Sequence, residues 1–409
     1  MTTPPQVLRP ADWDEWYGSL TLAFGGVPEA PEEVELYREL TECERSLGVR
    51  DDDRWVGTAG AFSFGLTVPG GQLVRAAGVT MVSVAATHRR RGVLTSMMRR
   101  QLDDVHALGE PLAVLTASEP DIYGRFGYGL GSRKLWLRVD TRRVTLRLPG
   151  GTDRVRLREV DPAKALAACE EVYARLVPER PGTTTHAPGW ERQALLDPPQ
   201  DRDGGSALRC VVAERDGVAV GYARFHTQPK WAPAGPDGVV LVRDLDALDP
   251  AARGALWNFL FGIDLTSWVV AKRRPVDDPL LQMVSDVRRC EVMVRDELFV
   301  RVVDVGAALA ARSYQVPLDV VLEVADDFCP WNAGRWRLVA DGPGARCERT
   351  EDPADLALGA RELGAAYLGG TSLVELAGAG RVRELVPGTL ERASLAFGAA
   401  RAPWVAHGF

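Results

Sequence analysis

The chain has 409 residues, of which 46% are hydrophobic and 26% charged, and this length predicts a soluble protein of two to four folded domains. With 49 basic and 56 acidic side chains its net charge is −7, so it lacks the basic surface that general nucleic-acid binding requires. This acidic balance is better suited to attracting small cationic substrates.

Residues 1 to about 145 combine helical and strand patterns, as a mixed α/β domain does. The opening residues 1–5 contain no basic or apolar segment, so we expect no signal peptide. Apolar residues at three- to four-residue spacing predict amphipathic helices over 13–24, 32–40 and 95–106. Val, Phe, Thr and small residues predict strands over 54–66, 73–84 and 112–116.

A Pro-Gly-Gly-Thr linker at 149–152 precedes the middle region, which contains a Pro- and Gly-rich loop over 177–203. Its apolar stretch 255–271 includes Asn258 and Asp264, is too short and too polar to cross a membrane, and predicts a buried amphipathic helix. Strands are predicted over 208–214, 218–226, 239–245, 299–303 and 320–324. Further helices are predicted from residue 251, over 355–363 and over 373–377.

Two short sequences, Arg91–Leu94 and Arg253–Leu256, form a predicted internal repeat. Each consists of Arg-Gly, an apolar residue and Leu, and each follows a predicted strand by a few residues. The second copy lacks the neighbouring arginines of the first. We therefore expect a repeated strand–loop–helix unit that keeps its basic loop only once.

The six cysteines and five histidines show no spacing typical of a disulfide framework or of a metal site. A chain of this size does not need disulfides in order to fold, so we expect free thiols in a reducing cytoplasm and no metal. The scattered cysteines are Cys43, Cys169, Cys210, Cys290, Cys329 and Cys347.

The strongest motif begins with a strand that ends near Val84, continues with three arginines at 89–91, and leads into a helix that begins near Gly92. The first N–H groups and the positive dipole end of a helix bind phosphate, and arginines add charge. Gly92 lets a ligand approach the backbone, and the strand edge at Val82 and Val84 can pair with an extended ligand arm. These features suit coenzyme A, whereas an isolated basic turn would be a solvated loop.

This motif resembles the acyl-coenzyme A loop of the GNAT superfamily, in which Gln or Arg stands three residues before a Gly and a small residue follows two positions after it. Leu94 replaces that small residue, which is typical of one branch, the enhanced intracellular survival (Eis) family. The segment 117–129 closely resembles the second signature of that family. The chain length and the C-terminal Phe409 also match it.

The resemblance implies an α/β fold with mixed sheets, in which tandem GNAT-like domains are followed by a sterol carrier protein-like domain. The implied domains are a catalytic domain over 1–148, a second domain with a decayed cofactor loop over 149–296, and the last domain over 297–409. It also implies acetyl-coenzyme A as cofactor and a homohexamer of two stacked trimers. The implied cofactor-binding residues are Val82, Val84, Arg89, Arg90, Gly92, Val93, Leu94 and Ser118.

The resemblance further implies that Tyr123 is the general acid, since a phenol with a pKa of about 10 can give a proton to the departing thiolate. From composition alone, Tyr123 and Tyr128 would both be core tyrosines. The implied base is the terminal carboxylate of Phe409, which is ionised above a pKa of about 3.5 and can hold a cation. A chain terminus is frayed by default, but the apolar residues 397 and 403–405 favour docking of the tail.

The implied substrate pocket is less acidic than in members that acetylate aminoglycosides. Gly25 and Gly26 stand where an acidic residue would help, and Gly408 precedes the terminal Phe. The implied substrate-binding residues are Tyr37 and Met81.

Three nearby acids are expected only to form a solvated helix face: Glu32, Glu33 and Glu35.

From the cofactor motif and the resemblance together we predict an N-acetyltransferase that acts on a small-molecule amine, with aminoglycosides or other polyamines as candidates. A protein-lysine acetyltransferase and a protein that binds an apolar ligand are the alternatives.

Overall fold

The structure is a computed structural model that describes residues 2–341 and 344–409, so Met1, with which the predicted first domain begins, lies outside it. Contacts divide the chain into two compact units that interleave in sequence. Unit 1 contains the chain up to Ser132 together with Pro181–Gly189 and Glu297–Phe409, and unit 2 contains Arg133–Arg180 and Trp190–Asp296. The three-domain division with boundaries after residues 148 and 296 stays a prediction.

The first sheet of unit 1 is mixed and has the strand order β1–β2–β3–β4–β5–β16–β6. The strands predicted over 54–66, 73–84 and 112–116 are confirmed as β3, β4 and β5. β16 comes from much later in the chain and pairs antiparallel with both β5 and β6. The strands are β1 (Gln6–Val7), β2 (Leu47–Asp51), β3 (Arg54–Thr67), β4 (Leu73–Val84), β5 (Leu112–Thr116), β6 (Gly129–Leu130) and β16 (Leu298–Val302).

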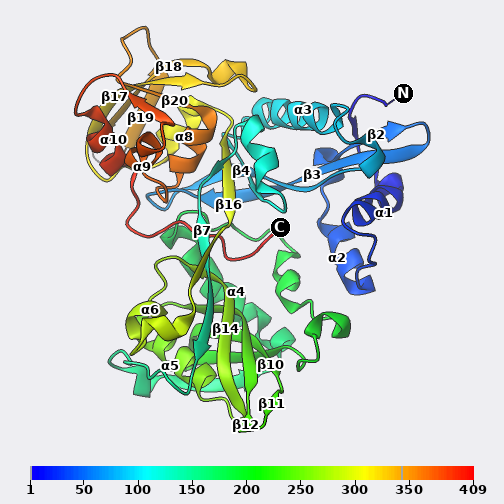
Figure 1. Ribbon diagram of the computed structural model, residues 1–409, viewed down its shortest axis with the longest axis vertical. Coiled ribbons are helices and arrows are strands. Elements are labelled where there is room, and N and C mark those ends of the chain that lie inside the picture. The colour runs from blue at the N-terminus through cyan, green and yellow to red at the C-terminus, as the bar shows by residue number, and fades with distance from the viewer. Residues whose placement is uncertain (1, 342–343) are drawn as a thin grey trace. The chain divides into compact units, whose positions relative to one another are not determined.

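The three helices predicted in this region are confirmed as α1 (Trp13–Ala23), α2 (Pro31–Leu40) and α3 (Val93–Ala107). In Figure 1, α3 lies along β3 and β4, and its buried side chains Met97 and Leu102 belong to the same apolar cluster as those strands. Phe24 differs from expectation, because α1 ends one residue earlier and the Phe24 side chain is 61% exposed instead of packing on the apolar face.

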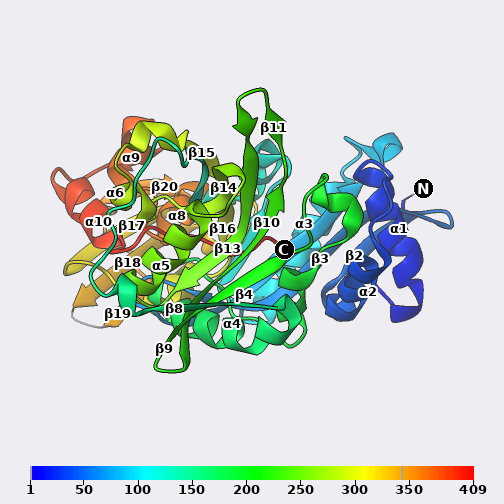
Figure 2. The ribbon, with the colours of Figure 1, turned by 90° about the horizontal axis from the view of Figure 1, so that it is seen from below.

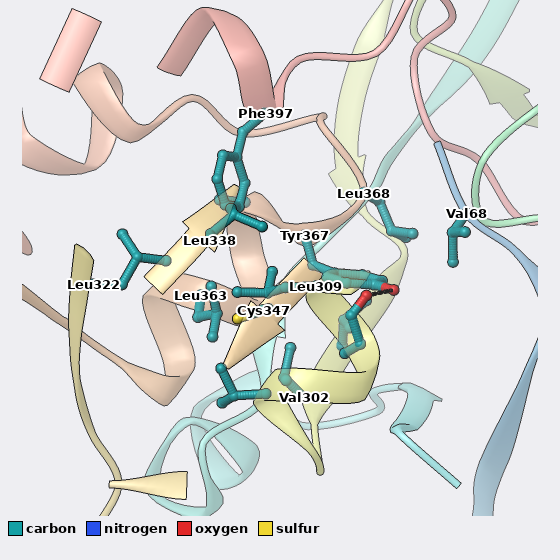
Figure 3. Close-up of a cluster of buried hydrophobic side chains, with 14 of the residues drawn as sticks. Val68, Val302, Leu309, Leu322, Leu338, Cys347, Leu363, Tyr367, Leu368 and Phe397 are labelled. Atoms are coloured by element: carbon teal, nitrogen blue, oxygen red, sulfur yellow. Dashed lines mark hydrogen bonds between the residues drawn. The ribbon is translucent and has the colours of Figure 1, made fainter. Parts of the chain in front are cut away.

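The last part of unit 1 is a second sheet with the order β19–β18–β17–β20–β21. Figure 3 shows part of its apolar core, where Leu322 and Leu338 from the sheet lie near Leu363 of α8 and Phe397 of α10. The elements are α7 (Val305–Ala311), β17 (Leu318–Ala325), β18 (Gly334–Asp341), β19 (Gly344–Arg349), β20 (Leu356–Gly359), α8 (Ala360–Tyr367), α9 (Leu373–Gly378), β21 (Val382–Glu384) and α10 (Thr389–Phe397).

The helix predicted over 355–363 is wrong in its first half. Residues 356–359 form β20, which pairs parallel with β17, and α8 begins only at Ala360. Residues 356–359 form a strand because they pair with β17, which is distant in sequence, and a local pattern cannot reveal such pairing.

Unit 2 is built on a mixed sheet with the order β15–β7–β14–β13–β10–β9–β8. β13 and β14 pair parallel, whereas β10 pairs antiparallel with β13, and these strands are visible in Figure 2. The elements are β7 (Arg133–Asp140), β8 (Arg156–Val160), α4 (Pro162–Leu176), β9 (Arg209–Arg215), β10 (Val218–Gln228), β11 (Trp231–Ala232), β12 (Gly235–Pro236), β13 (Gly238–Ala247), α5 (Pro250–Phe261), β14 (Thr266–Pro275), α6 (Leu280–Met283) and β15 (Met293–Asp296).

The buried helix predicted over 255–271 is wrong in its second half, because α5 ends at Phe261 and a strand, β14, begins at Thr266. Several residues of β14 are buried between its neighbours, and a buried strand gives the same apolar run as a buried helix. No helix in the described part of the chain combines the length and the apolar character that a membrane crossing requires.

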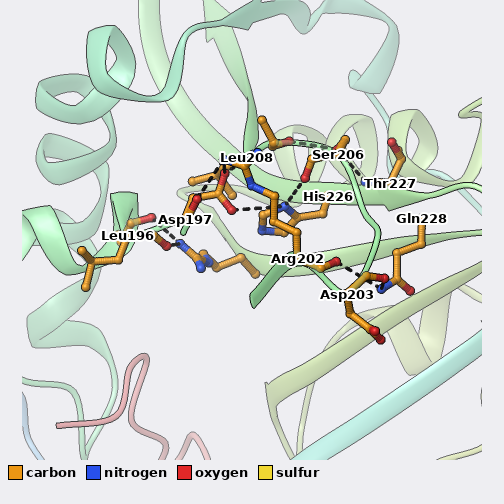
Figure 4. A network of polar contacts seen from close by, with 12 residues as sticks. Leu196, Asp197, Arg202, Asp203, Ser206, Leu208, His226, Thr227 and Gln228 are labelled. Carbon is orange, nitrogen blue, oxygen red and sulfur yellow. Dashed lines mark hydrogen bonds and ion pairs between the residues drawn. The ribbon is translucent and has the colours of Figure 1, made fainter. Parts of the chain in front are cut away.

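The predicted loop over 177–203 ends in a polar network within unit 2, which Figure 4 shows. The carboxylate of Asp197 accepts a hydrogen bond from the Leu208 N–H at 2.8 Å and forms an ion pair with Arg202 at 2.9 Å. The His226 Nδ1 lies 3.0 Å from the Ser206 carbonyl oxygen. The contact with Leu208 fastens the loop to the start of β9, and the contact with His226 fastens the residues that follow the loop to the end of β10.

Candidate active site

Unit 1 contains a cavity of about 940 Å³ whose wall comes from several elements. They are α1, α2, β4, the turn before α3, the end of β5 and the last residue of the chain. Every residue predicted for the site lines this cavity: Tyr37, Met81, Val82, Val84, Arg89, Arg90, Gly92, Val93, Leu94, Ser118, Tyr123 and Phe409. The structure therefore brings them together, while their roles stay predictions.

One wall of the cavity is formed where β4 and β5 diverge. The two strands pair parallel only from Ala76–Gly78 to Leu112–Val114, although β4 continues to Val84. On its other side β4 stays paired with β3 as far as Val84. The backbone of β4 beyond Gly78 therefore presents amide groups to the cavity, as an extended ligand with its own amides requires.

The start of α3 forms the basic end of the cavity. Gly92 is the N-cap, with a φ of 82° and no side-chain cap on the helix. A Cβ added at Gly92 would meet nothing within 4 Å, so the space beside this backbone is open. The side chains at 89–91 are all exposed arginines. An uncapped helix start beside exposed cations has the chemistry that a pyrophosphate group needs.

Tyr123 lies in a short 3-10 segment, Pro120–Phe126, that follows β5. Burial, and then the negative charge of the nearby Glu119, raise the pKa of Tyr123 to about 12. Its hydroxyl is therefore protonated throughout the neutral range. Tyr128 packs edge-on against Tyr123 with ring centroids 5.9 Å apart, but it is only 1% exposed and belongs to the core.

The C-terminal Phe409 lies where β4 and β5 diverge. Its ring packs edge-on against Phe64 with centroids 5.0 Å apart. A Cβ on Gly78 would lie 3.3 Å from the Phe409 ring and still closer to Phe64, so this glycine makes room for both rings. The hydroxyl of Thr116 donates to the terminal oxygen of Phe409 at 3.5 Å. The terminal carboxylate thus reaches the same cavity as Tyr123.

The side of the cavity formed by α1, α2 and the segment between them contains two residues that the sequence did not predict, Tyr17 and Glu29. The Tyr17 hydroxyl donates a short hydrogen bond to the Glu29 carboxylate. Burial and this contact raise the pKa of Tyr17 well above its usual value. The rings of Tyr17 and Tyr37 stack with centroids 6.3 Å apart, so an acid stands beside an aromatic wall.

Glu29 gave no sequence signal because it lies in the non-helical segment between α1 and α2, where no periodicity marks a buried or facing side. The predicted solvated helix face is correct for two of the three acids of α2, but Glu33 is half-buried, and its charge contributes to the raised pKa of Tyr17. The Glu33 carboxylate accepts the Ala30 N–H at 3.1 Å as part of the helix cap, and Glu32 and Glu35 are exposed.

Helix α5 in unit 2 contains the second copy of the predicted repeat, and it begins differently. Its N-cap Asp249 accepts the Ala252 N–H at 2.9 Å and forms an ion pair with Arg215 at 2.9 Å. Pro250, the first helical residue, has no N–H to offer. The half-buried Arg253 donates to the Ala247 carbonyl at 3.1 Å, and burial lowers its pKa. A carboxylate therefore already occupies this helix start.

Comparison with protein families gives two matches to acetyltransferase (GNAT) domains, one over residues 5–131 and one over 183–302. Residues 305–406 match a sterol carrier protein domain. The fold class predicted from the sequence, two GNAT domains followed by a sterol carrier protein-like domain with mixed sheets, is confirmed.

Full-length relatives agree with these matches. The chain is 65% identical over 409 residues to an uncharacterized N-acetyltransferase of Streptomyces avermitilis, with 100% of both chains covered. It is 33% identical over 400 residues, 94% of each chain, to the N-acetyltransferase Eis of Mycobacterium tuberculosis. Among solved structures, Eis1 from Mycobacterium abscessus is similar with a TM-score of 0.85, 32% identity and complete coverage of both chains.

Proposed function

Because the chain belongs to the Eis family of GNAT N-acetyltransferases, we propose that it transfers the acetyl group of acetyl-coenzyme A to a primary amine of a small cationic molecule. One observation carries the proposal. A single cavity joins the open edge of β4 and the uncapped start of α3 to Tyr123 and the terminal carboxylate of Phe409. The residues proposed to bind the cofactor, donate a proton and accept a proton thus line one cavity, which supports the proposal.

The cofactor would be held by the divergent edge of β4 and the start of α3. Val82 and Val84 offer backbone amides to the pantetheine arm, and Arg89, Arg90 and the first N–H groups of α3 hold the pyrophosphate. Gly92 leaves the space that this group needs. The bound cofactor supplies an acetyl group activated as a thioester.

Two groups of the chain would handle the protons. The Phe409 carboxylate attracts the substrate ammonium and accepts a proton from it, so that the neutral amine can attack the acetyl carbon. The Tyr123 hydroxyl then donates its proton to the sulfur that departs as thiolate. The raised pKa of Tyr123, about 12, keeps this proton in place until the thiolate forms.

The acceptor amine would lie between Tyr37, Met81 and Glu29. The carboxylate of Glu29 and the aromatic rings beside it favour a substrate with a second cationic or hydroxyl-bearing group. Polyamines and aminoglycosides have such groups, and we propose them as the candidate acceptors. We also propose that the protein works in the cytoplasm as a homohexamer, which light scattering on the purified full chain would test.

The experiment is a thiol-release assay with acetyl-coenzyme A and a panel of aminoglycosides, polyamines and lysine peptides. We expect turnover with at least one small amine and loss of turnover when one glycine is added after Phe409, which moves the carboxylate by about 3.5 Å. Phe409→Leu is the matched control, because it keeps the carboxylate at the same chain position. Turnover of the extended chain at the parent rate would refute the carboxylate's role.

A further inference from the structure

The segment Pro181–Gly189, which we call the strap, belongs to unit 1 although the chain on both of its sides belongs to unit 2. It pairs antiparallel with the end of β3 through backbone hydrogen bonds. The Gly182 N–H donates to the Thr67 carbonyl at 2.8 Å, and the Thr67 N–H donates back to the Thr183 carbonyl at 2.8 Å. The Thr185 N–H donates to the Gly65 carbonyl at 2.9 Å. The strap is therefore fixed to β3, the strand whose Phe64 packs against the ring of Phe409.

The opposite side of the strap holds the C-terminal tail, residues 398–409. The Trp404 N–H donates to the Pro181 carbonyl at 2.9 Å. Gly182 has a φ of 91°, and a Cβ there would come within 2.9 Å of the Trp404 carbonyl oxygen. Only glycine permits this approach of two backbones. The tail is thus docked side by side with the strap from Trp404 onward.

Two residues before the terminus, a side chain of the tail meets a side chain of the strap. The His407 Nε2 lies 3.2 Å from the hydroxyl oxygen of Thr184, which is fully buried. The His407 Nδ1 lies 3.3 Å from the Gly408 carbonyl oxygen. One neutral tautomer satisfies both contacts, because Nδ1 can donate to the carbonyl while Nε2 accepts from the hydroxyl. The ring of His186 packs beside His407 with centroids 4.8 Å apart.

The tail needs such contacts because residues 398–409 form no helix or strand in the structure. Val405 is buried in the core, but the last four residues are only half-buried. A terminal carboxylate without fixed neighbours would sample many positions and lose the advantage of orientation. Thr184 and His407 supply the last side-chain contact before Phe409.

We propose that Thr184 and His407 are positioning residues for acetyl transfer, whose contact aims the Phe409 carboxylate into the cavity. The inference rests on the proposed function, in which that carboxylate is the base. It assigns to the strap a part in catalysis although no strap residue lines the cavity. The contact acts on the base alone, so it should affect turnover and leave cofactor binding unchanged.

The test compares Thr184→Val, which keeps the shape and loses the hydroxyl, with Thr184→Ser, which keeps the hydroxyl. We expect Thr184→Val to lower kcat about tenfold or more, as small misplacements of catalytic groups do, with unchanged affinity for acetyl-coenzyme A and unchanged thermal midpoint. Thr184→Ser should stay near the parent rate. Parent kcat in Thr184→Val, or equal losses in both variants, would overturn the inference.

A second readout does not depend on activity. Carboxypeptidase should release Phe409 faster from Thr184→Val than from the parent or Thr184→Ser, as followed by intact mass. His407→Phe replaces the imidazole with an aromatic ring that has no nitrogen. It serves the same test in a half-buried position if the buried Thr184→Val fails to fold. Equal release rates in the parent and in the folded variant would overturn the inference.

The glycine-extended chain separates this inference from the proposed function. If the extension abolishes turnover while Thr184→Val and His407→Phe keep the parent rate, the carboxylate is the base and only the role of the strap is refuted. If the extended chain turns over at the parent rate, the proposed base is refuted, and the positioning role falls with it.

Discussion

Helices α3 and α5 both follow a strand of a mixed sheet and both carry an Arg-Gly sequence near their start, yet their first turns present opposite charges. The start of α3 has Gly92 as an open N-cap beside three exposed arginines. The start of α5 has Asp249 as a closed N-cap, and its Arg253 is turned inward to the Ala247 carbonyl. Helix α5 closes its start with a side chain, whereas α3 leaves its first N–H groups without a side-chain cap.

The two helix starts show that the helix dipole alone does not make an anion site. The first N–H groups of any helix attract negative charge, and a side-chain carboxylate supplies it as readily as a phosphate does. Asp249 with its partner Arg215 completes the α5 start from within the protein. No side chain among the described residues caps the α3 start, so its first N–H groups can accept an external anion.

The largest effect should come from replacing the arginines before α3 with acidic residues, so that this helix start becomes acidic like the start of α5. In Arg89→Glu combined with Arg90→Glu, the pyrophosphate would lose two cationic contacts and meet two like charges. We expect the Kd for coenzyme A, measured by calorimetry, to rise by about 100-fold or more. Arg383→Glu, at an exposed position of β21, is a charge-reversal control away from the cavity and should bind normally. Unchanged affinity in the double variant would remove the cofactor from this loop.

Tyr123→Phe separates binding at the open helix start from the chemistry that follows. The variant keeps the ring and loses the proton, so we expect kcat to fall roughly 100-fold while the Kd for coenzyme A stays the same. Tyr128→Phe is the matched control. The buried Tyr128 hydroxyl has no hydrogen-bond partner among residues 2–341 and 344–409, and its removal should leave both rate and stability near the parent values. Near-parent turnover in Tyr123→Phe would return this residue to a packing role.

Gly92→Ala tests the open space at the α3 start, with a smaller expected effect. The added Cβ clashes with no atom of the protein, but the backbone there is left-handed, which costs about 1 kcal/mol of stability for a non-glycine residue. The methyl group also enters the space proposed for the pyrophosphate, so we expect roughly tenfold weaker coenzyme A binding. Gly109→Ala, another left-handed position at the far end of α3, should show the stability loss alone.

The smallest effect is expected at the closed helix start. Asp249→Ala removes the cap of α5 and should lower the free energy of unfolding by about 1 kcal/mol in thermal or urea unfolding. We expect calorimetry still to find one coenzyme A per chain, because Pro250 and the inward Arg253 remain. A second bound coenzyme A in this variant, or in the parent, would show that the second domain keeps a cofactor site.

The same cap predicts a pH dependence with a definite sign. Burial acts to raise the pKa of Asp249, but the hydrogen bonds from Arg215 and the Ala252 N–H outweigh it, and the pKa is lowered. The cap therefore contributes stability at neutral pH that is lost as the pH falls below the unfolded-state pKa of about 3.9. The difference in free energy of unfolding between the parent and Asp249→Ala should therefore become smaller as the pH falls below about 3.9.

The sequence predicted the elements that depend on local patterns. The hairpin of β3 and β4 is rich in Val, Phe, Thr and small residues, and the helices α1, α2 and α3 bury apolar residues at three- to four-residue spacing, so local composition and periodicity were sufficient. The residues of the loop 82–94 follow one another in the chain, which is why one motif gave most of the cofactor side of the cavity.

What the sequence did not predict depends on contacts between distant segments. β16 pairs with β5 and β6, and β20 is a strand only because β17 lies beside it. Glu29 reaches the cavity through a loop without periodicity. The strap contains three consecutive threonines in a Pro- and Gly-rich stretch, and only its pairing with β3 and the tail gives it a place in the fold.

The contact between Phe409 and Gly78 has a consequence for biosynthesis. The chain is synthesised from its N-terminus, so β3 and β4 are complete long before Phe409 is added. These strands can fold early, but the cavity that they border lacks the part of its wall formed by Phe409 until that residue has docked. A chain that stops short of Phe409 would contain Tyr123 and residues 82–94 without this part of the wall.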